Sequence, residues 1–354
     1  MIPTLLFAIM TTHLGPMAPD SPAREPQIAA SASITAVAFG AGKAIYFSSS
    51  RDGGRTFTAP VKVVEAGIVP LTRHRGPRIA LSGNAIVITA VVGSKPEEGG
   101  HAHGLPSDGD LRVWRSEDGG KTWSAGNPVN DVPASATEGL HALASDGKGT
   151  LFAVWLDKRG AKGTKLYSAR STDGGITWSR NVAVYQSPGG SICECCHPSA
   201  AIDAAGQLLV MWRNSVDGSR DLYLTTSRDG ASFSTPRKLG NGTWKLNACP
   251  MDGGGLAASS NRIVTAWRRD SDVFLAEPGQ AERQIGTGKD VALALDGGRT
   301  YVAWVEGSQV DVWTDGKVEV LSKSGAFPAL SQLPGGGVLA AWEEDGAIQI
   351  RRLP

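Results

Sequence analysis

The stretch LFAVW at residues 151–155 is the best guide to the fold, because variants of it recur along the 354-residue chain. It is an apolar run that ends in Trp. Further copies are LLVMW at 208–212, RIVTAW at 262–267, TYVAW at 300–304 and VLAAW at 338–342. Two earlier runs, ITAVAF at 34–39 and AIVITAVV at 85–92, occupy the same place in the pattern without the Trp. Seven spaced copies of one phrase indicate a repeat architecture.

Each copy lies in a unit of four short segments. A small-residue segment precedes it, as in RIALSG at 78–83, and an alternating segment follows, as in KLYSARS at 165–171. A fourth, weaker segment closes most units, as in KVEVLSK at 317–323. Four short strands per repeat, bounded by Gly, Asp or Pro turns, are typical of a propeller blade. The sequence therefore predicts an all-β propeller of seven four-stranded blades, or of six if one weak copy is miscounted.

The last unit ends after its third segment. We therefore expect an N-terminal segment to supply the missing outer strand and to close the ring.

A sharper motif lies between the third and fourth segments of four units. Its copies are SRDGGRTF at 50–57, SEDGGKTW at 116–123, STDGGITW at 171–178 and the shorter SRDGASF at 227–233. The Asp can accept hydrogen bonds from its own turn, the glycines tolerate positive φ, and the aromatic residue can pack between blades. These motifs resemble the Asp boxes, or BNR repeats, of the sialidase-like propeller superfamily. The resemblance implies one propeller domain over residues 27–354 and a ligand site on the face opposite the Asp boxes.

Charge and hydropathy exclude several classes of partner. The 35 basic and 34 acidic residues are interspersed and give a formal net charge of +1, so we expect no nucleic-acid partner. No apolar run reaches the roughly eighteen residues of a membrane span. Residues 2–10 are apolar and precede a polar, Pro-rich stretch to residue 26, which makes residues 1–26 a candidate export signal without a basic start. We expect a monomer in the periplasm or outside the cell.

The alternation of strand direction assigns the loops to two faces. Loops that enter the first strand or leave the second strand of a blade share the face opposite the Asp boxes. By this map that face holds five of the six histidines and all four cysteines. We therefore expect it to bind the ligand, a carbohydrate or sugar acid.

The resemblance implies an exo-sialidase-like glycoside hydrolase, whose chemistry needs arginines for a carboxylate and a pair of acid/base groups. Residues that could form the arginine clamp are Arg75, Arg78, Arg213, Arg268 and Arg269. The acid could be Asp252 or Asp290, the base Glu138, and further substrate contacts His141 and His197. The sequence departs from the family pattern, because all five tyrosines fall in strands and the nucleophile cannot be placed. A non-catalytic propeller that binds a glycan or a protein is the alternative.

The cysteines form the most individual feature of the chain. SICECCHPS at 191–199 is echoed one blade later by NACPMDGGG at 247–255. Disulfides between or within these segments are one interpretation, and a redox-active thiol is another. The third is a copper or zinc site, since thiolate, imidazole and thioether are soft ligands. Its ligands would come from Cys193, Cys195, Cys196, His197, Cys249 and Met251, with His101, His103 and His141 nearby. Without such a site we expect no cofactor.

Overall fold

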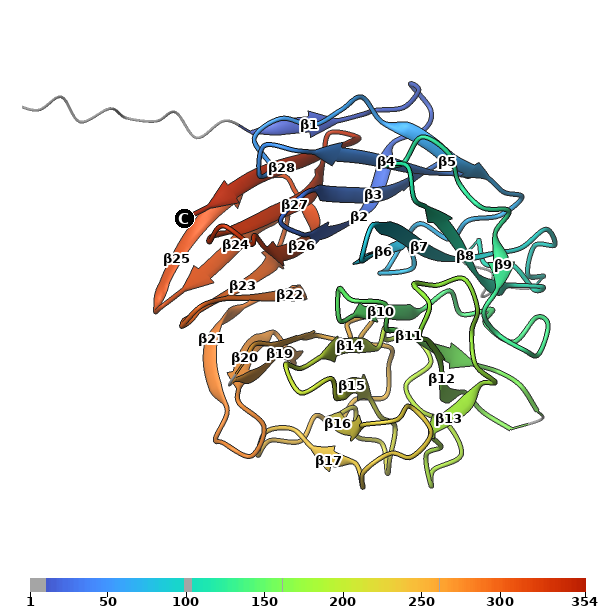
Figure 1. Ribbon diagram of the computed structural model, residues 1–354. Coiled ribbons are helices and arrows are strands. Elements are labelled where there is room, and N and C mark those ends of the chain that lie inside the picture. Colours follow the sequence, from blue (N-terminus) through green and yellow to red (C-terminus); the bar gives the residue numbers. More distant parts are fainter. Residues whose placement is uncertain (1–10, 99–103, 161, 261) are drawn as a thin grey trace, which may run out of the picture.

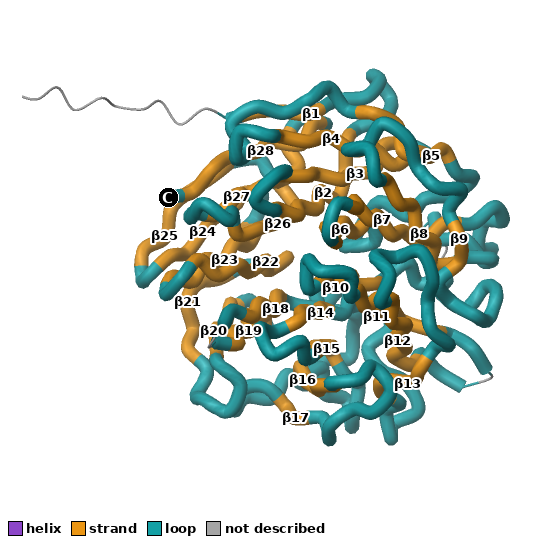
Figure 2. The backbone as a smooth tube through the Cα atoms, viewed as in Figure 1, coloured by secondary structure: helices purple, strands orange, loops and turns teal. Residues whose placement is uncertain are grey.

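The computed structural model describes residues 11–98, 104–160, 162–260 and 262–354, and these form seven four-stranded antiparallel sheets arranged in a ring (Figure 1). The described residues are strands, turns and loops, with no helix among them (Figure 2). None of them could therefore cross a membrane as a helix. The prediction of an all-β, seven-bladed propeller is confirmed, and the six-bladed alternative is wrong.

Six blades follow chain order from the axis outward. Blades 1 and 2 consist of β2 (Ala23–Ala30), β3 (Thr35–Ala41), β4 (Ala44–Ser50) and β5 (Val61–Glu65), then β6 (Arg78–Ser82), β7 (Ala85–Val92), β8 (Asp110–Ser116) and β9 (Asn127–Pro128). Blades 3 and 4 consist of β10 (His141–Ser145), β11 (Leu151–Asp157), β12 (Lys165–Ser171) and β13 (Val182–Tyr185), then β14 (Ser199–Ile202), β15 (Leu208–Arg213), β16 (Leu222–Ser227) and β17 (Arg237–Lys238). Blades 5 and 6 consist of β18 (Gly255–Ala258), β19 (Ile263–Arg269), β20 (Asp272–Ala276) and β21 (Arg283–Thr287), then β22 (Lys289–Asp296), β23 (Arg299–Glu306), β24 (Gln309–Thr314) and β25 (Lys317–Ser322).

Blade 7 joins the two ends of the chain. Its inner strands are β26 (Ala326–Gln332), β27 (Val338–Glu344) and β28 (Ala347–Leu353), and its outer strand is β1 (Thr12–Leu14). β1 lies beside β28 (Figure 1). Thr12 lies opposite Ile350 and Leu14 opposite Ile348, and the Leu14 side chain is buried. The predicted closure by an N-terminal segment is confirmed. Two strands, β1 and β2, begin before residue 27, whereas the apolar stretch 2–10 lies outside the described residues.

The core is divided among the interfaces between blades. Seven apolar clusters of described residues fill the seven interfaces, one cluster for each pair of neighbouring blades. A second strand such as β11 is buried along its whole length, because its two faces pack against different neighbours. Trp155, Trp212 and Trp304 are at most 1% exposed there. This burial explains the recurrence of apolar runs that end in Trp.

The Asp boxes brace their own turns. In blade 2, Asp118 accepts hydrogen bonds from the backbone N–H and the hydroxyl of Thr122, at 3.0 and 2.6 Å. The boxes of blades 1 and 3 make the same bonds. Gly120 has φ 91°, and a Cβ there would meet the Phe47 ring at 2.2 Å. Trp123 packs on Phe47 of blade 1, with ring centroids 5.4 Å apart. The motif therefore stabilises a turn and fastens two neighbouring blades together.

Candidate functional site

A pocket of about 770 Å³ opens on the axis of the ring. The residues that line it are Arg73, Arg75, Glu97, Leu105, Glu138, Lys158, Glu194, Cys195, Cys249, Pro250, Met251, Arg268, Lys289, Asp290 and Phe327. They come from loops that enter the inner strand of a blade or join its second and third strands, and from the ends of those strands. The pocket therefore lies at the opposite end of the blades from the Asp boxes, where the strand alternation predicts it.

Strained backbone aims several side chains at the axis. Glu25, Asp290 and Phe327 have φ of 55°, 58° and 48°, and each lies at a register shift near the start of an inner strand. Arg73 and His74, in the loop before β6, have φ of 60° and 66°. A bulge re-aims a side chain out of the regular strand alternation, and strain of this kind often marks functional sites.

An ion pair forms the floor of the pocket. His74 Nε2 lies 2.9 Å from Asp290 Oδ1, and the imidazole lies 4.3 Å from the His197 ring and 5.2 Å from the Phe327 ring. Burial of His74 disfavours its charged form, but the hydrogen bond and the negative charge of Asp290 outweigh this and raise the pKa of His74. Burial likewise opposes ionisation of Asp290, and the hydrogen bond and charge of His74 lower its pKa overall. The pair therefore holds opposite charges at the axis.

Below the pocket, a narrow channel is lined by residues at or near the inner strands of all seven blades, and two buried carboxyl groups lie in a chain of hydrogen bonds that leads to His74. Glu25 accepts a hydrogen bond from the His74 backbone N–H at 2.8 Å, and Glu343 accepts one from the Glu25 backbone N–H at 2.7 Å. Burial raises the pKa of Glu25 and raises that of Glu343 to about 7. These carboxyl groups support the loop that carries His74.

A second charged group lies on the pocket wall. Glu138 Oε1 is 2.5 Å from Lys158 Nζ, and Glu138 Oε2 is 3.6 Å from an Arg75 nitrogen. Arg75 Nε also donates to the Glu138 carbonyl at 2.6 Å. Arg75 Nη1 is buried and has no hydrogen-bond partner among the described residues. An anion in the pocket could compete with Glu138 for these two cations.

Of the five arginines expected in a clamp, the structure brings two to the pocket, Arg75 and Arg268. Arg78 is buried, and its guanidinium donates to the carbonyls of His74, Gly76 and Pro77.

The other two arginines are held by protein groups. Arg213 is 1% exposed and donates to the carbonyls of Asp252, Arg220 and Arg268, at 2.9, 2.6 and 3.0 Å. Arg269 pairs with Glu282 at 2.6 Å. Neither lines the pocket, because their guanidinium groups point to backbone or to a neighbouring side chain.

The carboxyl groups predicted as acid or base also differ in position, since two line the pocket and one does not. Glu138 and Asp290 line the pocket, whereas Asp252 is buried behind it. Asp252 accepts hydrogen bonds from the backbone N–H groups of Asp290, at 2.9 Å, and Gly254, at 3.1 Å. It therefore positions the backbone of Asp290.

The two described histidines expected to touch a ligand are also buried. His141 Nε2 contacts the Thr89 hydroxyl at 3.1 Å, and burial lowers the pKa of His141 to about 3. His197 Nδ1 accepts the Gly253 N–H at 3.3 Å, its Nε2 lies 3.2 Å from the Gly254 carbonyl, and burial lowers its pKa. Both ring nitrogens of His197 are thus engaged with backbone of blade 5. His101 and His103 lie outside the described residues.

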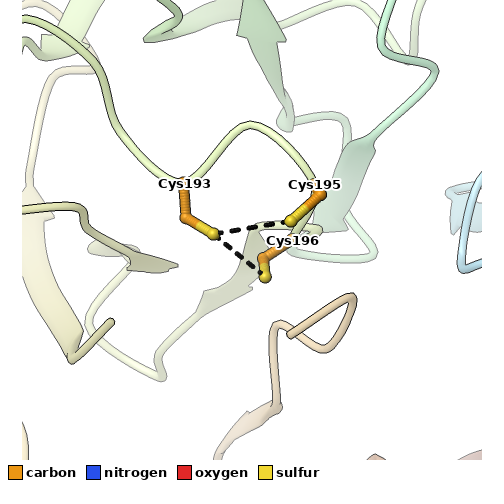
Figure 3. Close-up of side chains that lie close together, drawn as sticks. All are labelled: Cys193, Cys195 and Cys196. Carbon is orange, nitrogen blue, oxygen red and sulfur yellow. Dashed lines mark hydrogen bonds between the residues drawn. The ribbon is translucent and has the colours of Figure 1, made fainter. Parts of the chain in front are cut away.

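The expected disulfides are not formed. All four cysteines are free; Cys193, Cys195 and Cys196 are buried, and Cys249 is exposed on the pocket wall. Cys193 Sγ lies 3.7 Å from Cys195 Sγ and 3.3 Å from Cys196 Sγ, well beyond the ~2.05 Å of a disulfide (Figure 3). The hydrogen bond with Cys195 and burial raise the pKa of Cys193 to about 12. Met251 packs against the three buried thiols.

Sequence reasoning did not assign a site role to several residues of the pocket. Among them are Arg73, Lys158, Lys289 and Phe327, and His74 lies beneath the pocket as the partner of Asp290. The run RHR at 73–75 was a usable signal, since it lies in a loop that enters an inner strand. Lys158 and Lys289 had no distinguishing context, because isolated lysines usually lie in solvent.

Comparison with known proteins places this architecture in a family. A model described as a BNR repeat-like domain matches residues 86–287, more than half of the chain. No curated protein matches the sequence.

Several solved structures share the fold. A leech intramolecular trans-sialidase is 12% identical with a TM-score of 0.52, covering 94% of this chain and 68% of its own. An ulvan lyase, a polysaccharide lyase, is 12% identical with a TM-score of 0.56, covering 96% and 95%. An α-L-arabinofuranosidase of Fusarium graminearum is 12% identical with a TM-score of 0.54, covering 97% of both chains. At this identity the matches show a common fold.

Proposed function

Because this chain belongs to the BNR repeat-like domain family, we propose that it is a glycan-active propeller that hydrolyses the glycosidic bond of a sugar acid in its axial pocket. The observation that carries the proposal is the lining of the pocket. Five cationic residues, Arg73, Arg75, Lys158, Arg268 and Lys289, face four acidic ones, Glu97, Glu138, Glu194 and Asp290, around a volume suited to one or two sugar rings.

The cations would bind the carboxylate of the sugar acid. Arginine pairs with a carboxylate through two parallel hydrogen bonds, which orients the ligand as well as attracting it. Arg75, just before blade 2, offers an unpartnered buried N–H, counted over the described part of the chain, and Arg268 lines the pocket from blade 5. These two residues, with Arg73, are the proposed clamp.

Two carboxyl groups would perform the chemistry. Blades 3 and 6 lie on nearly opposite sides of the ring (Figure 1). Glu138 precedes blade 3 and Asp290 opens blade 6, and both line the pocket. Asp290, held ionised by His74, acts as the base or nucleophile. When the substrate carboxylate takes Arg75 and Lys158, Glu138 is released from its ion pairs, takes up a proton from solvent and donates that proton to the leaving group. Glycoside hydrolysis requires one carboxyl group in each of these roles.

The shared fold supports this choice of substrate class. The trans-sialidase, the ulvan lyase and the arabinofuranosidase with the same fold are all named for a glycan. Export from the cell, suggested by the apolar residues 2–10, would bring the protein to such substrates.

A propeller that binds the sugar acid without cleaving it is the second candidate. Two observations favour it: the two carboxyl groups proposed for catalysis, Glu138 and Asp290, are paired with cations, and none of the described tyrosines lines the pocket. A sialidase-type tyrosine nucleophile is therefore not proposed.

The test uses fluorogenic glycosides of sialic acid and glucuronic acid, with a neutral arabinofuranoside as the uncharged control. We expect turnover of an acidic glycoside, and we expect Asp290→Asn or Glu138→Gln to lower kcat by about 100-fold or more. Glu117→Gln, at an exposed carboxylate beside the Asp box of blade 2, is the control and should keep its activity.

Binding of the free sugar acid, measured by calorimetry, separates the two candidates. Binding without turnover of any glycoside would support the non-catalytic function. Turnover of the neutral substrate alone, or no binding of either acid, would refute the assignment of the pocket to sugar acids.

A further inference from the structure

Three buried thiols converge beside the axial pocket and play no part in the proposed hydrolysis. Cys193, Cys195 and Cys196 lie in the loop between β13 and β14, and their sulfur atoms point toward one another (Figure 3). The three sulfur atoms lie within 4.8 Å of one another, two of the separations being 3.7 and 3.3 Å. Three sulfur ligands at about 2.3 Å from one ion would be about 3.8–4.0 Å apart. The loop therefore already holds the thiols near the spacing of a metal site.

The backbone keeps this loop in place. The Cys193 N–H donates to the Arg213 carbonyl at 3.1 Å, and the Ile192 N–H donates to the Thr164 carbonyl at 3.0 Å. On the far side of the cluster, a Cβ added at Gly253 would meet the His197 carbonyl oxygen at 1.8 Å. Such close packing pre-organises the thiols, which lowers the entropic cost of binding an ion.

The neighbouring blade adds a thioether. Met251, before the first strand of blade 5, packs against the three cysteines, and its φ of 61° is a left-handed conformation that holds this position. The available donors are then all sulfur, because the ring nitrogens of His197 are engaged with Gly253 and Gly254. Thiolates suit both Cu(I) and zinc, but the thioether favours Cu(I), because zinc sites use Cys, His and carboxylate donors and not Met.

Charge and access also suit a monovalent ion bound by thiolates. The guanidinium groups of Arg213 and Arg75 interact electrostatically with the cysteines, so buried positive charge is at hand to balance the anionic complex. Cys195, Cys249 and Met251 line the pocket, whereas Cys193 and Cys196 lie behind them. An ion could thus enter from the pocket, meeting the exposed Cys249 first.

We propose that Cys193, Cys195 and Cys196 bind one Cu(I) ion as thiolates, with the thioether of Met251 as a further sulfur donor. Each thiol that binds the ion loses its proton to solvent, and the oxidation state of copper does not change. The site is separate from the carboxyl groups proposed for hydrolysis, so either proposal can fail alone.

The test is an anaerobic titration of the full-length, reduced protein with a Cu(I)–acetonitrile complex, in competition with bathocuproine disulfonate. We expect one Cu(I) per chain. Cys196→Ser should weaken binding by more than about 100-fold, since even the loss of groups that only support a ligand costs about 10–100-fold. Met251→Leu, which keeps the apolar volume, should weaken it by about tenfold. Cys249→Ser, at the exposed cysteine beside Cys195, removes a thiol that is not among the proposed ligands and should leave the stoichiometry at one.

X-ray absorption of the copper-loaded wild-type protein keeps the proposal testable if a variant fails to fold. We expect a shell of three or four sulfur atoms at about 2.3 Å and no nitrogen or oxygen ligand. Binding that depends on Cys249 alone, a nitrogen or oxygen shell, or Zn(II) that one equivalent of Cu(I) does not displace would each overturn the proposal. So would a Cys193–Cys196 disulfide in the natively purified protein that persists in place of copper binding.

Discussion

Replacing Arg213 with Met tests whether this buried arginine is a structural group or a ligand-binding one. The guanidinium donates to three backbone carbonyls at 2.6–3.0 Å and is 1% exposed. A hydrogen bond from a charged group contributes about 1.5–3 kcal/mol, and contributions within one cluster do not add fully. We therefore expect Arg213→Met, which keeps much of the apolar stem, to lower the free energy of unfolding by about 4 kcal/mol.

The same loss of unfolding free energy can be expressed as a decrease in melting temperature. At about 2.1 cal/mol/K per residue, a ring of this length that unfolds cooperatively has an unfolding entropy of about 0.7 kcal/mol/K, so Tm should fall by about 5 °C. Calorimetry and urea unfolding measure the two quantities, and sugar-acid affinity is measured well below Tm.

The control is Arg268→Met. Arg268 also follows the terminal Trp of a repeat, but it lines the pocket. We expect a change in unfolding free energy of less than about 1 kcal/mol and a loss of affinity of about tenfold or more. If Arg213→Met abolished sugar-acid binding at an unchanged Tm, the reasoning from its carbonyl contacts would be refuted.

Three further predictions concern stability. Asp173→Ala removes the hydrogen-bond acceptor of an Asp-box turn. Because this resembles the loss of a helix cap, it should lower the free energy of unfolding by about 1–2 kcal/mol, measured by thermal unfolding, without changing sugar-acid affinity. Lost affinity at an unchanged Tm would overturn the assignment of the ligand site to the opposite face. For the buried ion pair, the raised pKa of His74 contributes stability that is complete below about pH 6.5 and is lost as the pH rises through the pKa of His74 in the folded protein. The lowered pKa of Asp290 contributes stability that is present above about pH 3.9 and is lost as the pH falls through the pKa of Asp290 in the folded protein. Urea unfolding should therefore show the largest difference between wild type and Asp290→Asn within that window, and an equal difference at pH 9 would contradict the pairing. Deleting residues 1–16 removes β1 and the buried Leu14, and should cost at least the roughly 1.5–3 kcal/mol of that side chain; an unchanged denaturation midpoint would mean that β1 does not close the ring.

Most of the architecture could be predicted from the order of residues, because a propeller repeats one local pattern. The apolar run at 85–92 is β7 over the same bounds, and the run at 151–155 lies within β11. Counting strands in the last repeat also predicted its closure by β1. The inner strand of blade 1, β2, carries no clear signal, because Glu25 sits at a bulge with φ 55° and interrupts the alternation.

The site was harder to predict, since its face follows from strand direction but its membership does not. The pocket contains Glu138 and Asp290, as expected, while Asp252 lies behind Asp290 and supports its backbone. His74 reaches the axis through a left-handed loop conformation, and its partner lies 216 positions away. No local pattern reports such a pairing.

Arg213 and Arg268 illustrate which features of this protein the sequence determined and which ones depended on the tertiary structure. Each directly follows the Trp that ends an apolar run, so their local sequences predict the same strand, the same blade position and the same face. The four-strand repeat, the strand order and the face that holds the pocket therefore followed from the residues alone, because they depend on periodicity and turn chemistry, whereas the tertiary structure decided between seven blades and six. Whether each guanidinium group is buried or lines the pocket depended on contacts with other segments of the chain. Arg213 donates to carbonyls of residues 7, 39 and 55 positions away, whereas Arg268 lines the pocket. Long-range burial and hydrogen bonding thus separate a structural arginine from one that can meet a ligand.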